Sequence, residues 1–232
     1  MKPITLLALL ASSFSSTAMS ETSDNLPDPK LTEEWKEVIR VDTSNYIPSD
    51  AIVLLNGSEL NDSDLNAWQH GDGKPAQWTL ADGVMTVKPG TKGIQSKEKF
   101  CDAQIHLEWR SPTQLAHRTG QHDGNSGIYI QGRYEVQVLN SYNNDTYANG
   151  QAGAIYKQTP PLVNATKPVM EWQTYDIIFK APTFKANGAL DAKAAITVLH
   201  NGVVIQNNTI IDGGTTYRGA PSYKSHGCAP IH

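Results

Sequence analysis

The chain has 232 residues, of which 39% are hydrophobic and 18% are charged, with 18 glycines and 13 prolines. This composition is typical of a folded globular protein and not of an intrinsically disordered one. The formal net charge of -4 and the pI of about 5.9 exclude the basic character that nucleic-acid-binding domains usually have. We therefore expect one main domain, with a neutral partner and no nucleic acid.

The N-terminal segment predicts export. Lys2 precedes an apolar run over residues 4–10, and small residues lead to Ala18-Met19-Ser20. This layout is typical of a cleavable secretory signal, and the run is too short to cross a bilayer, which takes about 20 residues. We expect residues 1–20 to be a signal peptide and the protein to be periplasmic or secreted, without a membrane partner. The alternative is a buried N-terminal segment.

Residues 21–48 are polar and marked by prolines, which predicts an arm laid over the domain. At most one short helix is expected there. Thr32 is its candidate N-cap, and Glu33 and Glu34 suit the positive end of a helix dipole.

From Ala51 onward, short runs rich in β-branched and aromatic residues are divided by turns. Asp82-Gly83 and Asn201-Gly202 each stand between alternating runs, which is a strong hairpin signal. Strands without intervening helices predict an antiparallel all-β sandwich or jelly roll over residues 49–232. The expected strands lie within residues 51–57, 78–87, 103–110, 127–131, 133–140, 174–181 and 194–207.

The two cysteines, Cys101 and Cys228, leave two possibilities open. In an oxidising compartment they can form a disulfide, and otherwise they are two free thiols, with Cys101 a small buried residue. Two cysteines without a CxxC spacing argue against a structural zinc site.

Alternation along two of these strands separates an apolar face from a polar one. Trp109 is expected in the core, with Glu108 and Arg110 on the other face. Val136 is likewise expected in the core, with Glu135 and Gln137 opposite. If the two strands are neighbours in one curved sheet, these four polar residues line a hollow of the kind that holds small ligands. The alternative is an ordinary solvated sheet face.

Between the two strands, "DGNSG" predicts a tight polar loop. Gly124 and Gly127 permit backbone conformations that other residues resist, and Asn125 and Ser126 can hydrogen-bond locally. The loop is expected to brace the sheet edge where the polar side chains converge, or to be a structural turn and nothing more.

These segments carry a family resemblance. Residues 49–68, 78–87, 105–110, 124–142, 150–165 and 171–182 resemble, in order, the blocks of the 3-keto-disaccharide hydrolase family, also called the 3-keto-glucoside lyase/hydratase family and formerly the domain of unknown function 1080. The resemblance runs from about Ser49 to His232. It implies a concanavalin-like jelly roll, export, and action on sugars that carry a ketone at carbon 3.

The implied chemistry assigns candidate roles to the polar face. A ketone at carbon 3 acidifies the hydrogen on carbon 2, so the reaction needs a base, and Glu108 or Glu135 is the candidate. Arg110 is the candidate stabiliser of the enolate, and Asn125 and Gln137 the candidates that bind sugar hydroxyls. A divalent metal ion is an alternative to the guanidinium, although no ligand spacing indicates one.

Aromatic side chains complete a sugar site, because a ring face packs on the apolar side of a pyranose. Trp68, Tyr129 and Tyr156 are the candidates. For Trp68, a position in the core or at a sheet edge is the competing interpretation.

The chain also departs from the family's pattern. Asp123 and Asn140 stand where many relatives have arginine and aspartate. Relatives usually continue after the "SHGCAPIH" segment into a further strand, so we expect this chain to lack the family's final strand.

Three functions remain open on these residues. The first is cleavage of 3-keto-glycosides by β-elimination and hydration. The second is a noncatalytic carbohydrate-binding module, since fold does not fix function. The third is a glycosidase that uses Glu108 and Glu135 as its two carboxylates, which requires the pair to flank one glycosidic bond.

Overall fold

The computed structural model describes residues 27–55, 64–113 and 118–232, so the predicted signal peptide over residues 1–20 lies outside the described residues. The chain divides into two compact units, and the boundary along the sequence lies between Ala51 and Ile52. Among the described residues no helix has the length and apolar character needed to cross a lipid bilayer.

The described part of the first unit contains one short 3-10 helix, η2 (Pro29–Thr32). Its N-cap is Asp28, whose carboxylate accepts a hydrogen bond from the backbone N–H of Lys30 at 2.9 Å. The prediction that Thr32 caps a helix is wrong, because Thr32 is the last residue of this one. Pro29 has no N–H to satisfy and suits the first helical position.

In its described residues, the second unit is built from strands and three short 3-10 helices, which confirms the all-β prediction. The helices are η3 (Asp64–Ala67), η4 (Gly120–His122) and η5 (Ala148–Gly150). The strands are β1 (Trp68–His70), β2 (Thr79–Ala81), β3 (Val84–Thr86), β4 (Ile94–Ser96), β5 (Ala103–Trp109), β6 (Ser126–Ile130), β7 (Tyr134–Val138), β8 (Gln173–Lys180), β9 (Thr183–Phe184), β10 (Leu190–Ala192), β11 (Ala195–His200) and β12 (Val203–Ile210).

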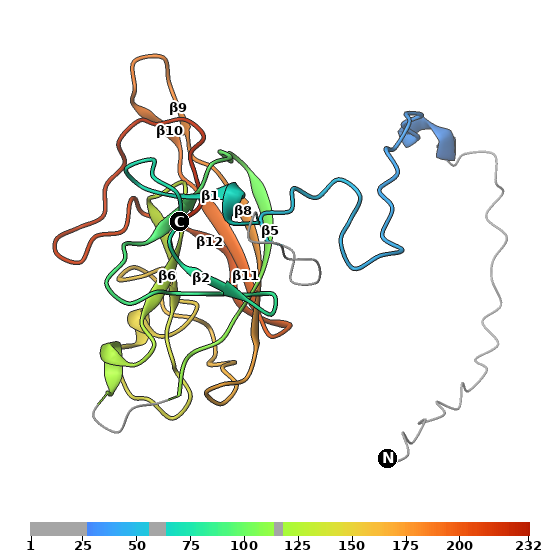
Figure 1. Ribbon diagram of the computed structural model, residues 1–232. Helices are drawn as coiled ribbons and strands as arrows, with labels where there is room; N and C mark the ends of the chain where they lie inside the picture. The colour runs from blue at the N-terminus through green and yellow to red at the C-terminus, as the bar shows by residue number, and fades with distance from the viewer. Residues whose placement is uncertain (1–26, 56–63, 114–117) are drawn as a thin grey trace, which may run out of the picture. The chain divides into compact units, whose positions relative to one another are not determined.

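The largest sheet has four strands in the order β12-β11-β8-β5, and Figure 1 shows them side by side. All its pairs are antiparallel. Residues alternate strictly between its two faces along β8, where Tyr175, Ile177 and Phe179 are buried. Trp109 of β5 joins them in the core, as its place in the sequence predicts.

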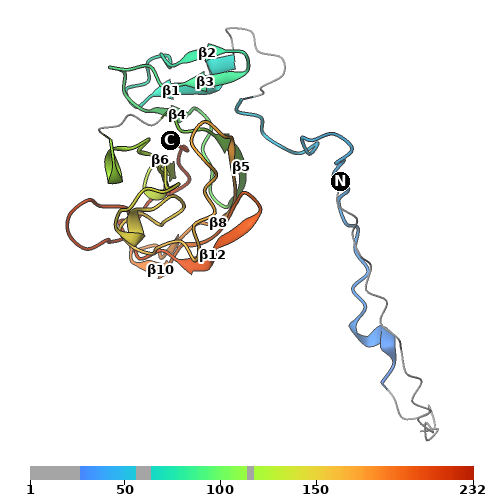
Figure 2. The same ribbon diagram turned by 90° about the horizontal axis from the view of Figure 1, so that it is seen from below.

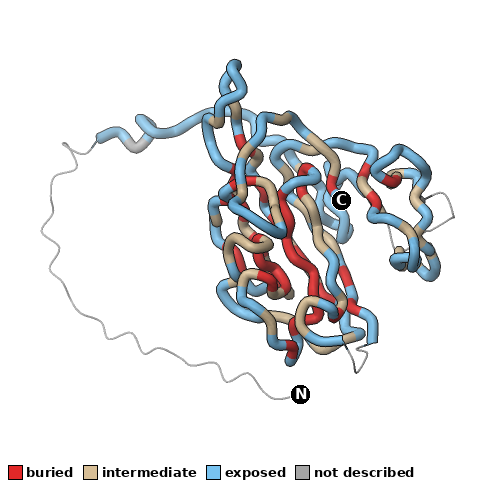
Figure 3. Tube along the Cα trace, turned by 90° about the vertical axis from the view of Figure 1, so that its left-hand side faces the viewer, coloured by how far each residue is buried: buried red, intermediate tan, exposed pale blue. Residues whose placement is uncertain are grey.

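A second layer is formed around the hairpin of β6 and β7. Tyr134, Val136 and Val138 of β7 pack against the inner face of the four-stranded sheet, and the ring of Tyr134 lies 5.7 Å from that of Phe179. Figure 3 shows the buried residues concentrated on the strands inside this unit. Two layers packed across one core make the domain a jelly-roll sandwich of the concanavalin-like class.

Both edges of the β6–β7 hairpin are covered by irregular segments. On the β7 side, the backbone N–H of Gln137 donates to Ala154 O and that of Tyr156 donates to Glu135 O. On the β6 side, Tyr129 and His232 exchange backbone hydrogen bonds of 3.0 and 2.9 Å. The hairpin therefore stands inside a wider ladder.

The two predicted hairpin turns are confirmed. Asp82 and Gly83 connect β2 and β3 with φ of 49° and 77°, and Asn201 and Gly202 connect β11 and β12 with φ of 52° and 80°. Positive φ at both central residues matches the right-handed twist of paired strands, which explains the choice of Asp-Gly and Asn-Gly.

The strand expected over residues 51–57 is not formed in its described part, since residues 51–55 are irregular. The carbonyl of Leu54 instead accepts a hydrogen bond from the indole nitrogen of Trp68 at 2.8 Å. The first strand is β1, which pairs with β4, and Figure 2 shows both beside β2 and β3.

Cys101 and Cys228 form a disulfide, which settles the choice that the sequence leaves open. Next to it, Phe100 and Ala229 form an antiparallel bridge. The start of β5 is thus fastened to a segment more than a hundred residues later in the chain.

Candidate functional site

Glu135 is a buried carboxylate on the face of β7 that is turned away from the core. It lies in the middle of β7 and points away from the core that Tyr134 and Val136 enter, because neighbouring residues of a strand face opposite sides. Its exposed fraction is 5%. Across the hairpin it is paired with Tyr129, so both side chains lie on the same face.

Gly127 makes room for this carboxylate. Gly127 is paired with Gln137 in the hairpin, and a Cβ atom built on it would overlap the Glu135 side chain, whose Cγ would be 2.8 Å away and whose carboxylate carbon 2.9 Å away. The glycine is therefore required here by close approach of a side chain and not by a special φ.

Burial raises the pKa of Glu135 above the ordinary value of 4.5, and a hydrogen bond from the Tyr129 hydroxyl partly offsets the rise. In the described part of the chain, Oε2 of Glu135 is buried without a hydrogen-bond partner. A carboxylate of raised pKa with one uncommitted oxygen is a stronger base than an exposed one.

The amide of Gln137 is flanked by acceptors on both sides. In one orientation its nitrogen donates to Gln121 Oε1 at 3.2 Å and Asn125 Oδ1 at 3.4 Å. Turned over, it donates to Glu135 Oε1 at 3.0 Å and Ser126 O at 3.1 Å. With the nitrogen towards the loop, the amide oxygen is placed to accept a hydrogen bond from the protonated form of Glu135. Gln137 thus links the carboxyl group to the polar loop.

The predicted polar loop converges on this face, as its composition suggests. Gln121 donates to Gly150 O at 2.8 Å and to Thr146 Oγ1 at 3.2 Å, which fixes its own amide oxygen towards Gln137. Asn125 donates to Gln121 O at 2.9 Å. The loop is therefore anchored to the segment around η5.

Aromatic side chains and one lysine form the rim. The hydroxyl groups of Tyr156 and Tyr147 are 2.8 Å apart. The ammonium group of Lys157 lies 4.3 Å from the ring centre of Tyr147 and 5.3 Å from that of Tyr217. Burial and the Tyr147 hydroxyl raise the pKa of Tyr156, and the negative charge of Glu135 adds to the rise. Tyr156 and Glu135 therefore interact electrostatically. Lys157, Tyr147 and Gln121 are residues of this site that the sequence analysis did not predict.

The structure brings together Tyr129, Glu135, Gln137, Asn125 and Tyr156, which are five of the predicted site residues. No pattern in the sequence singles out Lys157. It lies within a matched block of the family resemblance, but its position depends on a backbone φ of 63°, which a sequence does not reveal.

Glu108 and Arg110 lie elsewhere, so the expected common hollow is wrong. β5 pairs with β8 and not with β6 or β7, and Glu108 is exposed on the outer face of the four-stranded sheet. Arg110 is also exposed and its guanidinium lies 4.9 Å from the ring centre of Trp172. Because Glu108 and Glu135 both point away from the core between their two layers, they cannot flank one glycosidic bond, and the two-carboxylate glycosidase loses its basis.

Trp68 also lies apart from this face. It is half-buried in β1, and its indole nitrogen is held by Leu54 O. This agrees with the interpretation of Trp68 as an edge residue.

A resident metal ion has no evident ligand set in residues 27–55, 64–113 and 118–232, where no three His, Cys, Asp or Glu side chains gather in a way that could hold one.

Comparisons with known proteins give a family and a solved relative. A profile of the family described as "3-keto-alpha-glucoside-1,2-lyase-like domain" matches residues 50–228. A crystal structure from Parabacteroides distasonis ATCC 8503, of a protein named "putative glycosyl hydrolase", is 45% identical to the chain. Its TM-score is 0.80, and the match covers 88% of this chain and 87% of that one.

Two further structures from the same organism, with the same description, are more distant. They are 16% and 18% identical, with TM-scores of 0.47 and 0.44. They cover 68% and 61% of this chain, and 72% and 66% of their own. No curated protein sequence matches the chain.

Proposed function

Since the chain belongs to the 3-keto-α-glucoside-1,2-lyase-like domain family, we propose that it cleaves 3-keto-glycosides by β-elimination followed by hydration, with Glu135 as the base. The observation that carries this proposal is the position of Glu135, buried beside Tyr129 with a raised pKa and one uncommitted oxygen.

The elimination uses the acidity that the ketone gives to carbon 2. Glu135 takes the proton from carbon 2, and the electron pair of the C–H bond forms the enolate of the carbon-3 ketone. The enolate then expels the group on carbon 1 as the C1–O bond breaks, and the leaving oxygen takes the proton that Glu135 removed from carbon 2, which returns Glu135 to its ionised form. Addition of water across the resulting enone completes a net hydrolysis.

Tyr129 donates its one hydroxyl proton to Glu135 in the free protein. It is the proposed donor to the enolate oxygen once Glu135 has taken the proton from carbon 2. Burial and the neighbouring Glu135 raise the pKa of Tyr129 above its ordinary value of 10.0, so the hydroxyl keeps its proton over the physiological range. A neutral donor beside a carboxylate base lets one group accept charge while the other stabilises it.

Lys157 supplies the positive charge that the sequence assigned to Arg110. Its ammonium group, held between two tyrosine rings, attracts negative charge on the sugar or the leaving group. Because Glu135 has an exposed fraction of 5%, a substrate has to displace part of the rim. The long Lys157 side chain is the part that moves most easily.

The remaining residues bind the sugar. The amides of Asn125 and Gln137 offer donors and acceptors to the ring hydroxyls, and the ring of Tyr156 offers an apolar surface. Export to an oxidising compartment is part of the proposal, and the disulfide of Cys101 and Cys228 supports it.

The test is to incubate the purified protein with a 3-keto-disaccharide and with the parent disaccharide, each with and without a chelator. Release of product from the ketone alone is expected. Cleavage of the parent alone overturns the proposal in favour of an ordinary glycosidase. Binding of the ketone without turnover would make the protein a carbohydrate-binding module.

A further inference from the structure

A hollow of about 390 Å³ lies beside the turn between β6 and β7, where Gln131 is one of its lining residues. Its wall includes His226, whose Nε2 is 2.8 Å from the hydroxyl of Tyr134. Because Tyr134 and Glu135 are adjacent in β7, their side chains point in opposite directions. The hollow is therefore separate from the site proposed above, and its volume is within the range of small-molecule pockets.

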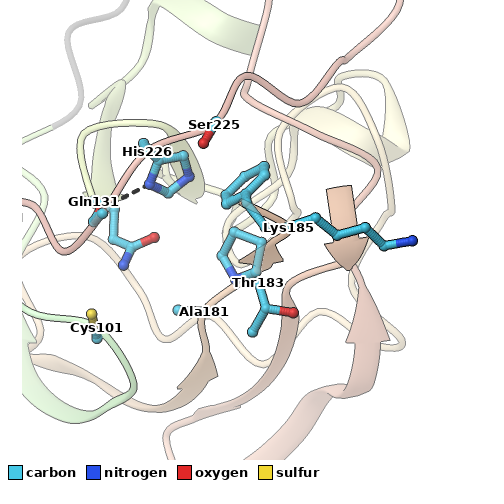
Figure 4. Close-up of a pocket in the computed structure, with 10 residues that line it drawn as sticks. Cys101, Gln131, Ala181, Thr183, Lys185, Ser225 and His226 are labelled. Atoms are coloured by element: carbon cyan, nitrogen blue, oxygen red, sulfur yellow. Dashed lines mark hydrogen bonds between the residues drawn. The ribbon is translucent and has the colours of Figure 1, made fainter. Parts of the chain in front are cut away.

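Gln131 offers this hollow an acceptor that no described residue satisfies. Its side chain is 1% exposed, and its amide nitrogen donates to Phe100 O at 3.1 Å. That bond fixes which way the amide faces, and the amide oxygen is left buried without a hydrogen-bond partner. Figure 4 shows this oxygen turned towards the middle of the hollow. A buried acceptor of this kind favours a ligand that brings an O–H or N–H donor.

An aromatic corner stands next to the acceptor. The rings of Phe184 and His226 are 5.3 Å apart at 64°. Both nitrogens of His226 are occupied, one by Tyr134 and the other by Gly227 O at 2.9 Å. The imidazole therefore offers the hollow its carbon surface, and Pro182 adds a further apolar wall.

The charge of the lining selects among ligands. Lys185 is a cation, and none of the ten lining residues is acidic. A positively charged ligand is disfavoured and a neutral ligand is accepted. Figure 4 shows the Lys185 side chain turned away from the hollow, so this flexible side chain has to swing inward before a carboxylate gains attraction. Ser225 contributes a hydroxyl group to the same lining.

We propose that this hollow binds one pyranose ring, neutral or bearing a carboxylate. The ring's C–H face packs on the corner of Phe184 and His226, and one of its hydroxyls donates to Gln131 Oε1. The disulfide holds the wall in place, because Cys101 lines the hollow and Cys228 follows Gly227 directly. The hollow gives the protein a sugar contact that is independent of the reaction at Glu135.

The experiment is an NMR titration of the disulfide-bonded protein with methyl α-glucopyranoside and with methyl glucuronoside. Saturable shifts are expected at Gln131, Phe184, Ser225 and His226. The dissociation constant should be on the order of 1 mM, as fits a ligand of about a dozen non-hydrogen atoms. The uronoside should bind more tightly.

Variants assign the shifts to the hollow. Ser225→Phe fills it and should abolish the shifts, and Gln131→Leu should weaken them. Lys185→Met should remove the preference for the uronoside, whereas Lys224→Met, at an exposed lysine next to the hollow, should not. Glu135→Gln should leave the shifts in place, which separates this site from the proposed catalytic one.

The proposal is overturned if the sugars shift the resonances only of residues around Glu135. It is also overturned if the shifts of the lining residues do not saturate even well above millimolar sugar concentration, which would mean that Gln131 Oε1 is hydrogen-bonded by water alone. Binding that persists in a folded Ser225→Phe variant also overturns it. Thermal melts of each variant identify any that fail to fold, and the Lys185 and Lys224 pair keeps the test decisive in that case.

Discussion

Asn140 donates a side-chain hydrogen bond of 2.6 Å to Asp123, and the backbone N–H of Asn140 donates to the backbone oxygen of Asp123 at 3.0 Å. Both residues are almost fully buried. These are two positions at which the family resemblance leads us to expect other residues, and the structure joins them in one contact.

The contact between Asp123 and Asn140 predicts a loss of stability on one substitution that a second substitution restores. Asn140→Asp would place two carboxyl groups in buried contact and should lower the free energy of unfolding by about 3–5 kcal/mol at neutral pH. The double variant Asp123→Asn, Asn140→Asp restores a donor and an acceptor in exchanged positions and should recover most of the loss. Asp123→Asn alone is the control, since two amides can still pair. Chemical denaturation measures all three, and a double variant no better than Asn140→Asp would show that the contact is not the cause.

Glu135→Gln should lower turnover of a 3-keto-glycoside by about 10²-fold or more if Glu135 is the base. Glu108→Gln is the matched control on the outer sheet face and should leave turnover near normal. Initial rates measured at saturating substrate decide between them. A loss in Glu108→Gln equal to that in Glu135→Gln would contradict the assignment.

The thermal stability of the Glu135→Gln variant distinguishes a catalytic role of Glu135 from a structural one. Since the folded protein raises the pKa of Glu135, ionisation of this group opposes folding, and the cost is present once the pH rises through the folded pKa. Glu135→Gln should therefore raise the melting temperature at pH 7 or leave it unchanged. A strong decrease would mean that the carboxylate holds the fold together.

Tyr129→Phe should move the acidic limb of the pH–rate profile to higher pH. The Tyr129 hydroxyl lowers the pKa of Glu135 through a hydrogen bond, while burial raises it, so removal of the hydroxyl leaves only the raising effect. The base must be ionised to act, and the pH at which activity begins follows its pKa. A profile of kcat/KM against pH for both proteins provides the measurement. An unshifted limb would show that Glu135 is not the titrating base.

His200 should make the domain sensitive to mild acid. Burial lowers its pKa from 6.5 to about 4, and it lies between Tyr175 and Trp109 with its Nε2 3.1 Å from Gln173 Oε1. Because the folded pKa lies below the unfolded one, this stability is complete above about pH 6.5 and is lost as the pH falls towards 4. The loss should approach about 3 kcal/mol.

His200→Gln keeps a donor towards Gln173 and should flatten the dependence of stability on pH between these values. His122→Gln, at an exposed position in η4, is the control and should not. Unfolding curves at several pH values make the comparison, and an equally steep decline in His200→Gln would assign the acid sensitivity to other groups.

Reduction of the disulfide should lower the free energy of unfolding by about 5 kcal/mol, on the chain-entropy estimate for a loop of this length. The loop closed by Cys101 and Cys228 spans 127 residues. For a domain of this size the melting temperature should fall by about 10–20 °C. Calorimetry with and without a reductant, with reduction verified by mass, makes the measurement. An unchanged melting temperature after complete reduction would contradict it.

Local signals predicted what depends on neighbouring residues. The Asp82-Gly83 and Asn201-Gly202 turns follow from the twist that paired strands impose. Alternation placed Trp109 in the core and Glu135 opposite Val136. Each of these features is decided within a few positions along the chain.

Features that depend on contacts between distant residues could not be predicted from these local signals. Alternation predicts which face of the sheet Glu108 occupies, but not which strand lies beside β5. Because β5 pairs with β8 and not with β7, Glu108 lies apart from Glu135 and not beside it. Lys157 reaches the site through a backbone conformation that no local pattern announces. The bond of Asn140 to Asp123 joins residues 17 positions apart, whose contact depends on how the loop returns to β7.

The bridge of Phe100 with Ala229 also bears on the order in which the molecule can assemble. β5 obtains its partner β8 only after some seventy further residues have been synthesised, and its flank obtains Ala229 later still. The local hairpins can pair early, but β5 has no partner strand during much of synthesis, and pairing between such distant strands is slow. A growing chain whose main sheet closes late stays unfolded for longer, which suits the export that we propose.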